Sequence, residues 1–215
     1  MNRAKGALLV WLAGAVAAGC NSADPSVPDE LLEAIARRGN ASDYPEGPYG
    51  TRQGDVLPDL CFEGWLSPRD AAFDPARASR VCLSDLRATP SARVLLVNSG
   101  AVWCVACRAE YGGSRDRPSL AERLAERSDR GLMVLGSLFE TRDARPPDLA
   151  DAALWARTFE VDFPFVVDGA YSLGTSAIAP ENRVVDLETM EVVLALQGDE
   201  PATLFAAIDA LLGGE

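Results

Sequence analysis

Short apolar runs recur through the second half of the chain, and they predict buried strands. Residues 93–98, 132–138 and 165–167 are predominantly apolar and too short for typical helices. Two further apolar runs, 182–187 and 191–196, are separated by a three-residue turn and predict a β-hairpin. The pattern therefore predicts three buried strands followed by a hairpin.

Segments with helical periodicity lie between these strands. A helix is expected to begin at Cys104, to be interrupted between residues 112 and 118 by two glycines and a proline, and to resume over 120–125. Residues 149–159 predict a second helical segment, and residues 203–212 predict the last one. The order βαβα, then a hairpin, then a helix predicts an α/β fold with a central mixed sheet flanked by helices.

The N-terminus has the pattern of a secretory signal. Arg3 and Lys5 precede an apolar stretch over residues 7–18, which ends in Gly19 and Cys20. This stretch is short for a transmembrane helix. The pattern predicts that the protein is exported.

Residues 17–20, Ala-Ala-Gly-Cys, resemble the lipobox of bacterial lipoproteins, although Ala17 replaces the usual Leu. The resemblance implies that Cys20 is lipidated and becomes the mature N-terminus, and acyl chains would hold the protein at a membrane. The alternative is an ordinary signal peptide with an incidental cysteine. Residues 21–28 are polar and look like a tether, and residues 29–38 predict a short amphipathic helix.

Two short strands, each with one cysteine, are predicted ahead of the α/β core. They cover residues 56–62 and 80–83. In an exported protein, Cys61 and Cys82 are expected to form a structural disulfide, and the alternative is two free buried thiols.

The composition excludes several functions. The formal net charge of −12 argues against nucleic acid or an anionic membrane surface as a partner. The absence of histidine excludes a Ser-His or Cys-His catalytic pair and any His-ligated metal or haem site. We expect no cofactor and no metal site.

The sequence Trp103-Cys104-Val105-Ala106-Cys107 stands at the junction between a predicted strand and a predicted helix. A Cys-x-x-Cys in this position is a redox motif, because unpaired N–H groups and the helix dipole favour a thiolate on the first sulfur. The second sulfur lies about one turn away and can form a disulfide with the first. The alternatives are a static disulfide or part of a zinc site, but no second Cys-x-x-Cys supplies the other ligands.

This motif resembles the active site of thioredoxin-fold thiol-disulfide oxidoreductases of bacterial envelopes, the TlpA- and ResA-like proteins. The matching pattern is an apolar strand, Asn98, a short connection, Trp103-Cys-x-x-Cys107, then a basic residue and Glu110. The resemblance covers about residues 51–215 and implies a thioredoxin-like fold with an N-terminal strand extension. The family usually has aromatic residues where Ser99 and Gly100 stand, which predicts looser packing beneath the motif.

The resemblance also implies roles for individual residues. Cys104 would be the nucleophile and Cys107 the resolving cysteine, while Trp103 would pack beside the sulfurs and limit access of water. Glu110 would accept a proton or tune the thiol pKa values; the alternative is an exposed helix charge. The family has a cis-proline before its terminal hairpin, which identifies Pro180 here.

Pro164 is a second candidate for the cis-proline, but it precedes the strand at 165–167 rather than the hairpin.

The resemblance implies that the protein is an enzyme, a thiol-disulfide oxidoreductase of the cell envelope that exchanges disulfides with protein substrates. Residues 1–19 would be the signal peptide, residues 20–50 a lipid-anchored tether and residues 51–215 the thioredoxin-like domain. The periplasmic location implies a membrane redox partner that supplies electrons, and the lack of His between the cysteines favours a reductant.

Two alternative functions remain open. One is a thiol peroxidase of the peroxiredoxin branch, although that chemistry needs a Thr or Ser where Ala101 stands. The other is a surface lipoprotein that uses the fold as a binding module, with Cys104–Cys107 as a static disulfide.

Overall fold

The computed structural model describes residues 44–173 and 178–213. The predicted lipidation site at Cys20 and the predicted helix over 29–38 lie outside these residues. Within the described residues, seven strands and five α-helices, with two short 3-10 turns, follow one another in this order: β1 (Cys61–Trp65), η2 (Pro75–Arg77), β2 (Ser79–Cys82), α2 (Leu83–Arg87), β3 (Val94–Ala101), α3 (Val105–Gly112), α4 (Leu120–Ala125), η3 (Ser128–Arg130), β4 (Leu132–Glu140), α5 (Leu149–Thr158), β5 (Phe165–Val167), β6 (Glu181–Asp186), β7 (Val192–Gln197) and α6 (Pro201–Leu211).

The strands form one mixed sheet in the order β2-β1-β5-β4-β3-β6-β7. Strands β3, β4 and β5 run parallel, and β6 and β7 join the β3 edge as an antiparallel hairpin. This arrangement confirms the predicted central mixed sheet. Strands β1 and β2 extend the sheet beyond β5 in antiparallel pairing, which confirms the N-terminal strand extension.

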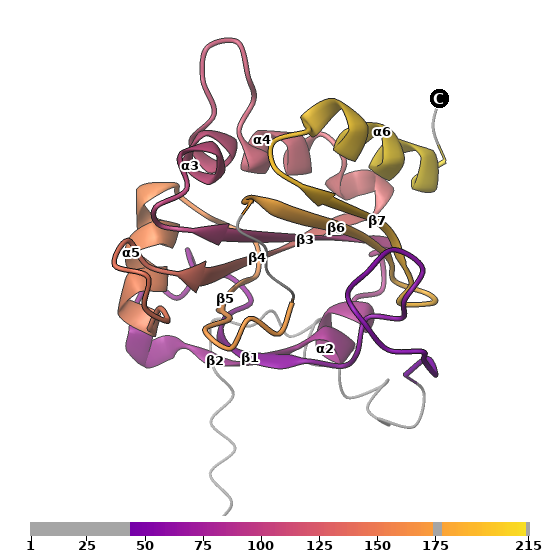
Figure 1. Ribbon diagram of the computed structural model, residues 1–215, viewed down its shortest axis with the longest axis horizontal. Helices are drawn as coiled ribbons and strands as arrows, with labels where there is room; N and C mark the ends of the chain where they lie inside the picture. The colour runs from indigo at the N-terminus through magenta and orange to yellow at the C-terminus, as the bar shows by residue number, and fades with distance from the viewer. Residues whose placement is uncertain (1–43, 174–177, 214–215) are drawn as a thin grey trace, which may run out of the picture.

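Alternation along β3 divides the core into two layers. Val94 and Leu96 face a cluster that includes buried residues of α3, α4, α5 and α6, whereas Leu95 and Val97 face a cluster with buried residues of α2. In Figure 1, α3, α4 and α6 lie at the top of the view, and α2 lies near the bottom beside β1. Side chains of β3 that point toward α3 can therefore reach the redox motif.

The first predicted strand differs from the observed one. Residues 56–62 were expected to form it, but β1 begins at Cys61, and Val56 makes only isolated bridges to Tyr49 and Glu191. Pro58 has no N–H to donate to a ladder, so continuous pairing begins after it. Tyr44, which the domain prediction placed in the tether, packs against the domain and donates its hydroxyl to the Leu57 carbonyl at 2.8 Å.

A disulfide joins Cys61 to Cys82, and the two residues are directly paired partners of β1 and β2. The Cα atoms are 4.0 Å apart, and the bond closes a loop with a sequence separation of 21 residues. The bridge therefore crosslinks the two strands at the outer edge of the sheet.

Replacing both cysteines, Cys61→Ser and Cys82→Ser, should lower the free energy of unfolding by about 3 kcal/mol, because the unfolded chain gains the entropy of the opened loop. Urea unfolding followed by circular dichroism measures the change. An unchanged urea midpoint would show that the bridge does not stabilise the fold.

Candidate active site

The disulfide of Cys104 and Cys107 lies at the N-terminus of α3, directly beyond the carboxyl end of β3. Cys104 is the N-cap residue, and its sulfur accepts a hydrogen bond from the Cys107 N–H at 2.9 Å. Both cysteines are buried, with Cys104 3% and Cys107 0% exposed. After reduction, the same N–H group and the helix dipole would stabilise a thiolate on Cys104.

The strand beneath the disulfide is buried along its whole length. Ser99 is buried and accepts a hydrogen bond from the Ser137 hydroxyl at 2.8 Å. A Cβ atom at Gly100 would lie 3.4 Å from the Cβ of Cys107, which is an ordinary contact distance. Looser packing at Ser99 and Gly100 than in the resembling family stays a prediction.

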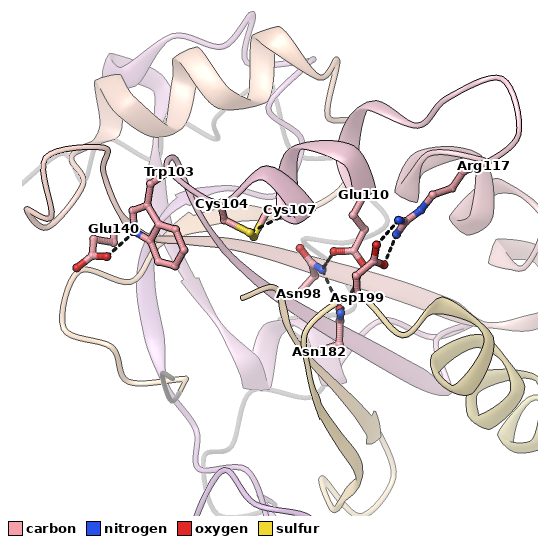
Figure 2. Close-up of a disulfide and its surroundings, with 9 residues drawn as sticks. All are labelled: Asn98, Trp103, Cys104, Cys107, Glu110, Arg117, Glu140, Asn182 and Asp199. Carbon is pink, nitrogen blue, oxygen red and sulfur yellow. Dashed lines mark hydrogen bonds and ion pairs between the residues drawn. A yellow bond between two sulfur atoms is a disulfide. The ribbon is translucent and has the colours of Figure 1, made fainter. Parts of the chain in front are cut away.

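Glu110 lies on the buried face of α3, as does Cys107, and it is only 5% exposed. Asn98 from β3 donates its amide to one carboxylate oxygen at 2.7 Å, and Asn182 from β6 donates to the other at 3.3 Å. Asn98 also donates to the Asn182 carbonyl oxygen at 2.8 Å, and the two residues are directly paired across the strands. Figure 2 shows the three side chains converging beside the disulfide.

Burial raises the pKa of Glu110 from 4.5 to about 7, because desolvation disfavours the charged carboxylate. The hydrogen bonds from Asn98 and Asn182 act in the opposite direction and limit the increase. Asp199 raises the pKa further and Arg117 lowers it, each through its charge. The carboxyl group can therefore change protonation near neutral pH. The alternative of an exposed helix charge is wrong.

An ion pair joins Arg117, in the connection between α3 and α4, to Asp199, in the connection between β7 and α6. Figure 2 shows this pair next to Glu110. Sequence reasoning missed both residues, because nothing in the local pattern indicates that these two connections meet.

Trp103 lies on the other side of the disulfide in Figure 2, away from Glu110. It is 38% exposed, and its indole N–H donates to Glu140 at 2.5 Å. Glu140 also accepts a hydrogen bond from the Tyr171 hydroxyl at 2.9 Å, and Phe139 packs edge-on against the Trp103 ring. The indole is therefore held in place at the surface.

The peptide bond between Ala179 and Pro180 is the one cis peptide bond in the described part of the chain. Pro180 directly precedes β6, which pairs with β3, and its carbonyl accepts a hydrogen bond from the Gly198 N–H at 2.8 Å. The prediction that the cis-proline is Pro180 rather than Pro164 therefore agrees with the structure.

All four cysteines of the described residues are in disulfides. In residues 44–173 and 178–213, no group of three or more acidic or cysteine side chains could hold a metal ion. Nor does this part of the chain include a helix with the length and hydropathy needed to cross a bilayer.

Known structures share this architecture. A candidate thiol:disulfide interchange protein, DsbE, from Chlorobium tepidum is 21% identical over 76% of this chain and all of its own, with a TM-score of 0.55. A secreted thiol-disulfide isomerase from Corynebacterium glutamicum is 18% identical over 74% of this chain and 86% of its own, with a TM-score of 0.53.

The thioredoxin domain of a thiol-disulfide oxidoreductase from Bacteroides vulgatus is also similar, with 18% identity over 76% of this chain and all of its own and a TM-score of 0.52. No protein-family model and no curated protein matches the chain. At these identities the similarities show that the fold is thioredoxin-like.

The variant Glu110→Gln tests the buried carboxyl group through the pH dependence of stability. Below the ordinary pKa of 4.5, Glu110 is protonated in both folded and unfolded chains. As pH rises toward 7, the unfolded chain ionises first, so the folded wild type loses stability. We expect the wild type to lose about 3 kcal/mol relative to the variant between pH 4 and pH 8.

Urea unfolding of the oxidised proteins at a series of pH values measures this difference. Glu63→Gln, at an exposed position on β1, is the matched control and should follow the wild type. Parallel stability curves for wild type and Glu110→Gln would contradict the account.

Proposed function

We propose that this chain is a thiol-disulfide oxidoreductase that exchanges disulfides with protein substrates through Cys104 and Cys107. The observation that carries the proposal is the disulfide at the start of α3, with the Cys104 sulfur at the N-cap and a backbone N–H directed at it. The names of the similar solved proteins, which include thiol:disulfide interchange proteins, support the same activity.

In the reduced enzyme, the Cys104 thiolate would attack one sulfur of a substrate disulfide and release the other as a thiolate. The Cys107 thiolate would then attack the Cys104 sulfur, re-forming the enzyme disulfide and releasing the second substrate thiolate. Two electrons pass from enzyme to substrate, and the substrate thiolates take up protons.

Glu110 is proposed to accept the proton that Cys107 loses before it attacks. A general base works best when its pKa lies near the ambient pH, and the pKa of Glu110 is about 7. Both residues lie on the buried face of α3, and Asn98 and Asn182 hold the carboxyl group in position. A carboxylate also disfavours a neighbouring thiolate, so neutralising Glu110 by protonation would favour the Cys107 thiolate.

Trp103 and Pro180 are proposed to form the surface that receives the substrate. Trp103 directly precedes the nucleophile and remains partly exposed, so it can pack against a substrate chain. The cis-proline would expose neighbouring backbone for pairing with an extended substrate.

The enzyme is proposed to act as a reductant. Val105 and Ala106 separate the two cysteines, and neither side chain offers a cation to the Cys104 thiolate. Strong stabilisation of the thiolate makes an oxidant, so its absence favours donation of electrons. In an oxidising compartment, a membrane redox partner would then return electrons to the pair.

The location is proposed to be the periplasmic side of a bacterial membrane, with the chain anchored through lipid on Cys20. The signal pattern and the residues before Cys20 support this location. Incorporation of labelled palmitate into the wild type but not into Cys20→Ser would be the expected result. Labelling of neither protein would overturn the anchor.

Two single variants separate the roles of the cysteines. Cys104→Ser should abolish exchange with a protein disulfide, because the remaining thiol of the motif, Cys107, is fully buried and cannot reach the substrate. Cys107→Ser should retain the attack and accumulate a mixed disulfide with the substrate, because the resolving thiol is missing. Non-reducing electrophoresis and mass spectrometry measure both outcomes. Undiminished exchange by Cys104→Ser would reject the proposed function.

A further inference from the structure

A pocket of about 330 Å³ lies beside the redox motif. Val102, which is two residues before Cys104, and Arg108, which follows Cys107, form part of its lining. The rest comes from the segment after β4 and from α5. Figure 1 shows α3 close to α5 at one end of the sheet, and Tyr111 of α3 packs edge-on against Trp155 of α5. The pocket is therefore within reach of a substrate bound at Cys104.

The lining combines apolar surface with positive charge. Leu154 and Phe159 of the α5 region contribute apolar area, and Leu154 is 65% exposed. Three arginines also line the pocket, at positions 108, 142 and 145, together with Asp143 and Asp151.

The three arginines differ in their partners. Arg145 forms an ion pair with Asp151 at 2.8 Å, and the charge of Asp143 also acts on it. The side chains of Arg108 and Arg142 are exposed, and neither forms an ion pair or a hydrogen bond within residues 44–173 and 178–213. Two cations without carboxylate partners thus face a pocket in a chain whose net charge is −12.

Apolar side chains are also exposed within the redox motif and close to Pro180 in the sequence. Val105, between the two cysteines, is 79% exposed, and Ile178, two residues before Pro180, is 57% exposed. Together with Trp103 they offer exposed apolar side chains that a bound polypeptide can cover. An extended chain advances about 3.3 Å per residue, so residues a few positions from a substrate cysteine would lie over the pocket.

We propose that this pocket binds an acidic segment of the substrate polypeptide, next to the cysteine that reacts with Cys104. Carboxylates of the segment pair with Arg108 and Arg142, and its aliphatic carbons pack on Leu154 and Phe159. The inference rests on the proposed function and specifies the class of substrate. The net negative charge of the protein repels an acidic partner at long range. At physiological salt the Debye length is about 8 Å, so dissolved ions screen this long-range repulsion more strongly than they screen the direct ion pairs in the pocket.

The test uses two synthetic nonapeptides, each with a central cysteine and each supplied as its disulfide-linked dimer. One has Glu at the second and third residues on each side of the cysteine, and the other has Gln there. The full-length chain carrying Cys20→Ser is reduced and freed of reductant. The second-order rate of reduction of each dimer is then measured by mass spectrometry in 0.15 M salt.

The wild-type background should reduce the Glu peptide about three- to tenfold faster than the Gln peptide, as expected for two exposed ion pairs. In the double variant Arg108→Gln, Arg142→Gln, the two rates should become about equal. The ratio is the readout, because loss of Arg108 beside Cys107 can also change the reactivity of the thiols with both peptides.

The matched control is Arg80→Gln, Arg93→Gln, which removes the same charge from the outer strand β2 and from the amino end of β3. This control should keep the wild-type ratio. Equal rates in the wild type, or a preference that survives in the double variant, would overturn the inference while leaving the oxidoreductase intact. Faster reduction of free glutathione disulfide than of either peptide would also overturn it, because the occupant would then be a small anionic disulfide. Reduction of no peptide at all would instead reject the proposed function.

Discussion

Strand β3 is buried along all eight of its residues, and the position of the whole site depends on that burial. Pairing with β4 on one side and β6 on the other fixes its carboxyl end in the middle of the sheet. The chain then turns through Trp103, and Cys104 becomes the N-cap of α3. The fold thereby brings a sulfur atom to a helix N-terminus, where a thiolate is stabilised.

The same strand also supports a buried acid. Alternation along β3 directs Asn98 toward α3, where it meets Glu110. A carboxyl group that is 5% exposed would be costly without hydrogen-bond donors, and the paired amides of Asn98 and Asn182 supply them. Desolvation raises the pKa of Glu110 more than these hydrogen bonds lower it, so the pKa of Glu110 is about 7 and the carboxyl group is suited to proton transfer.

Much of this arrangement could be predicted from the sequence. The apolar runs placed β3, β4 and β5, and the Cys-x-x-Cys motif placed the redox pair, because both signals are local. The contact of Asn98 with Asn182 could not be predicted, since it depends on the register between β3 and a strand 84 residues away. The same limit applies to the ion pair of Arg117 with Asp199 and to the pocket between α3 and α5, which exist only after the sheet has formed. The first strand was misplaced because local hydrophobicity outweighed Pro58, which interrupts pairing.

The reduction potential of the Cys104–Cys107 pair tests the central claim most directly. The full-length chain carrying Cys20→Ser would be equilibrated in graded dithiol buffers and alkylated, and the modified cysteines would be counted by mass. The account predicts reversible two-electron exchange with a potential near the ~−270 mV of thioredoxin. A pair that never exchanges with the buffer would contradict it, because Cys104–Cys107 would then be a static disulfide.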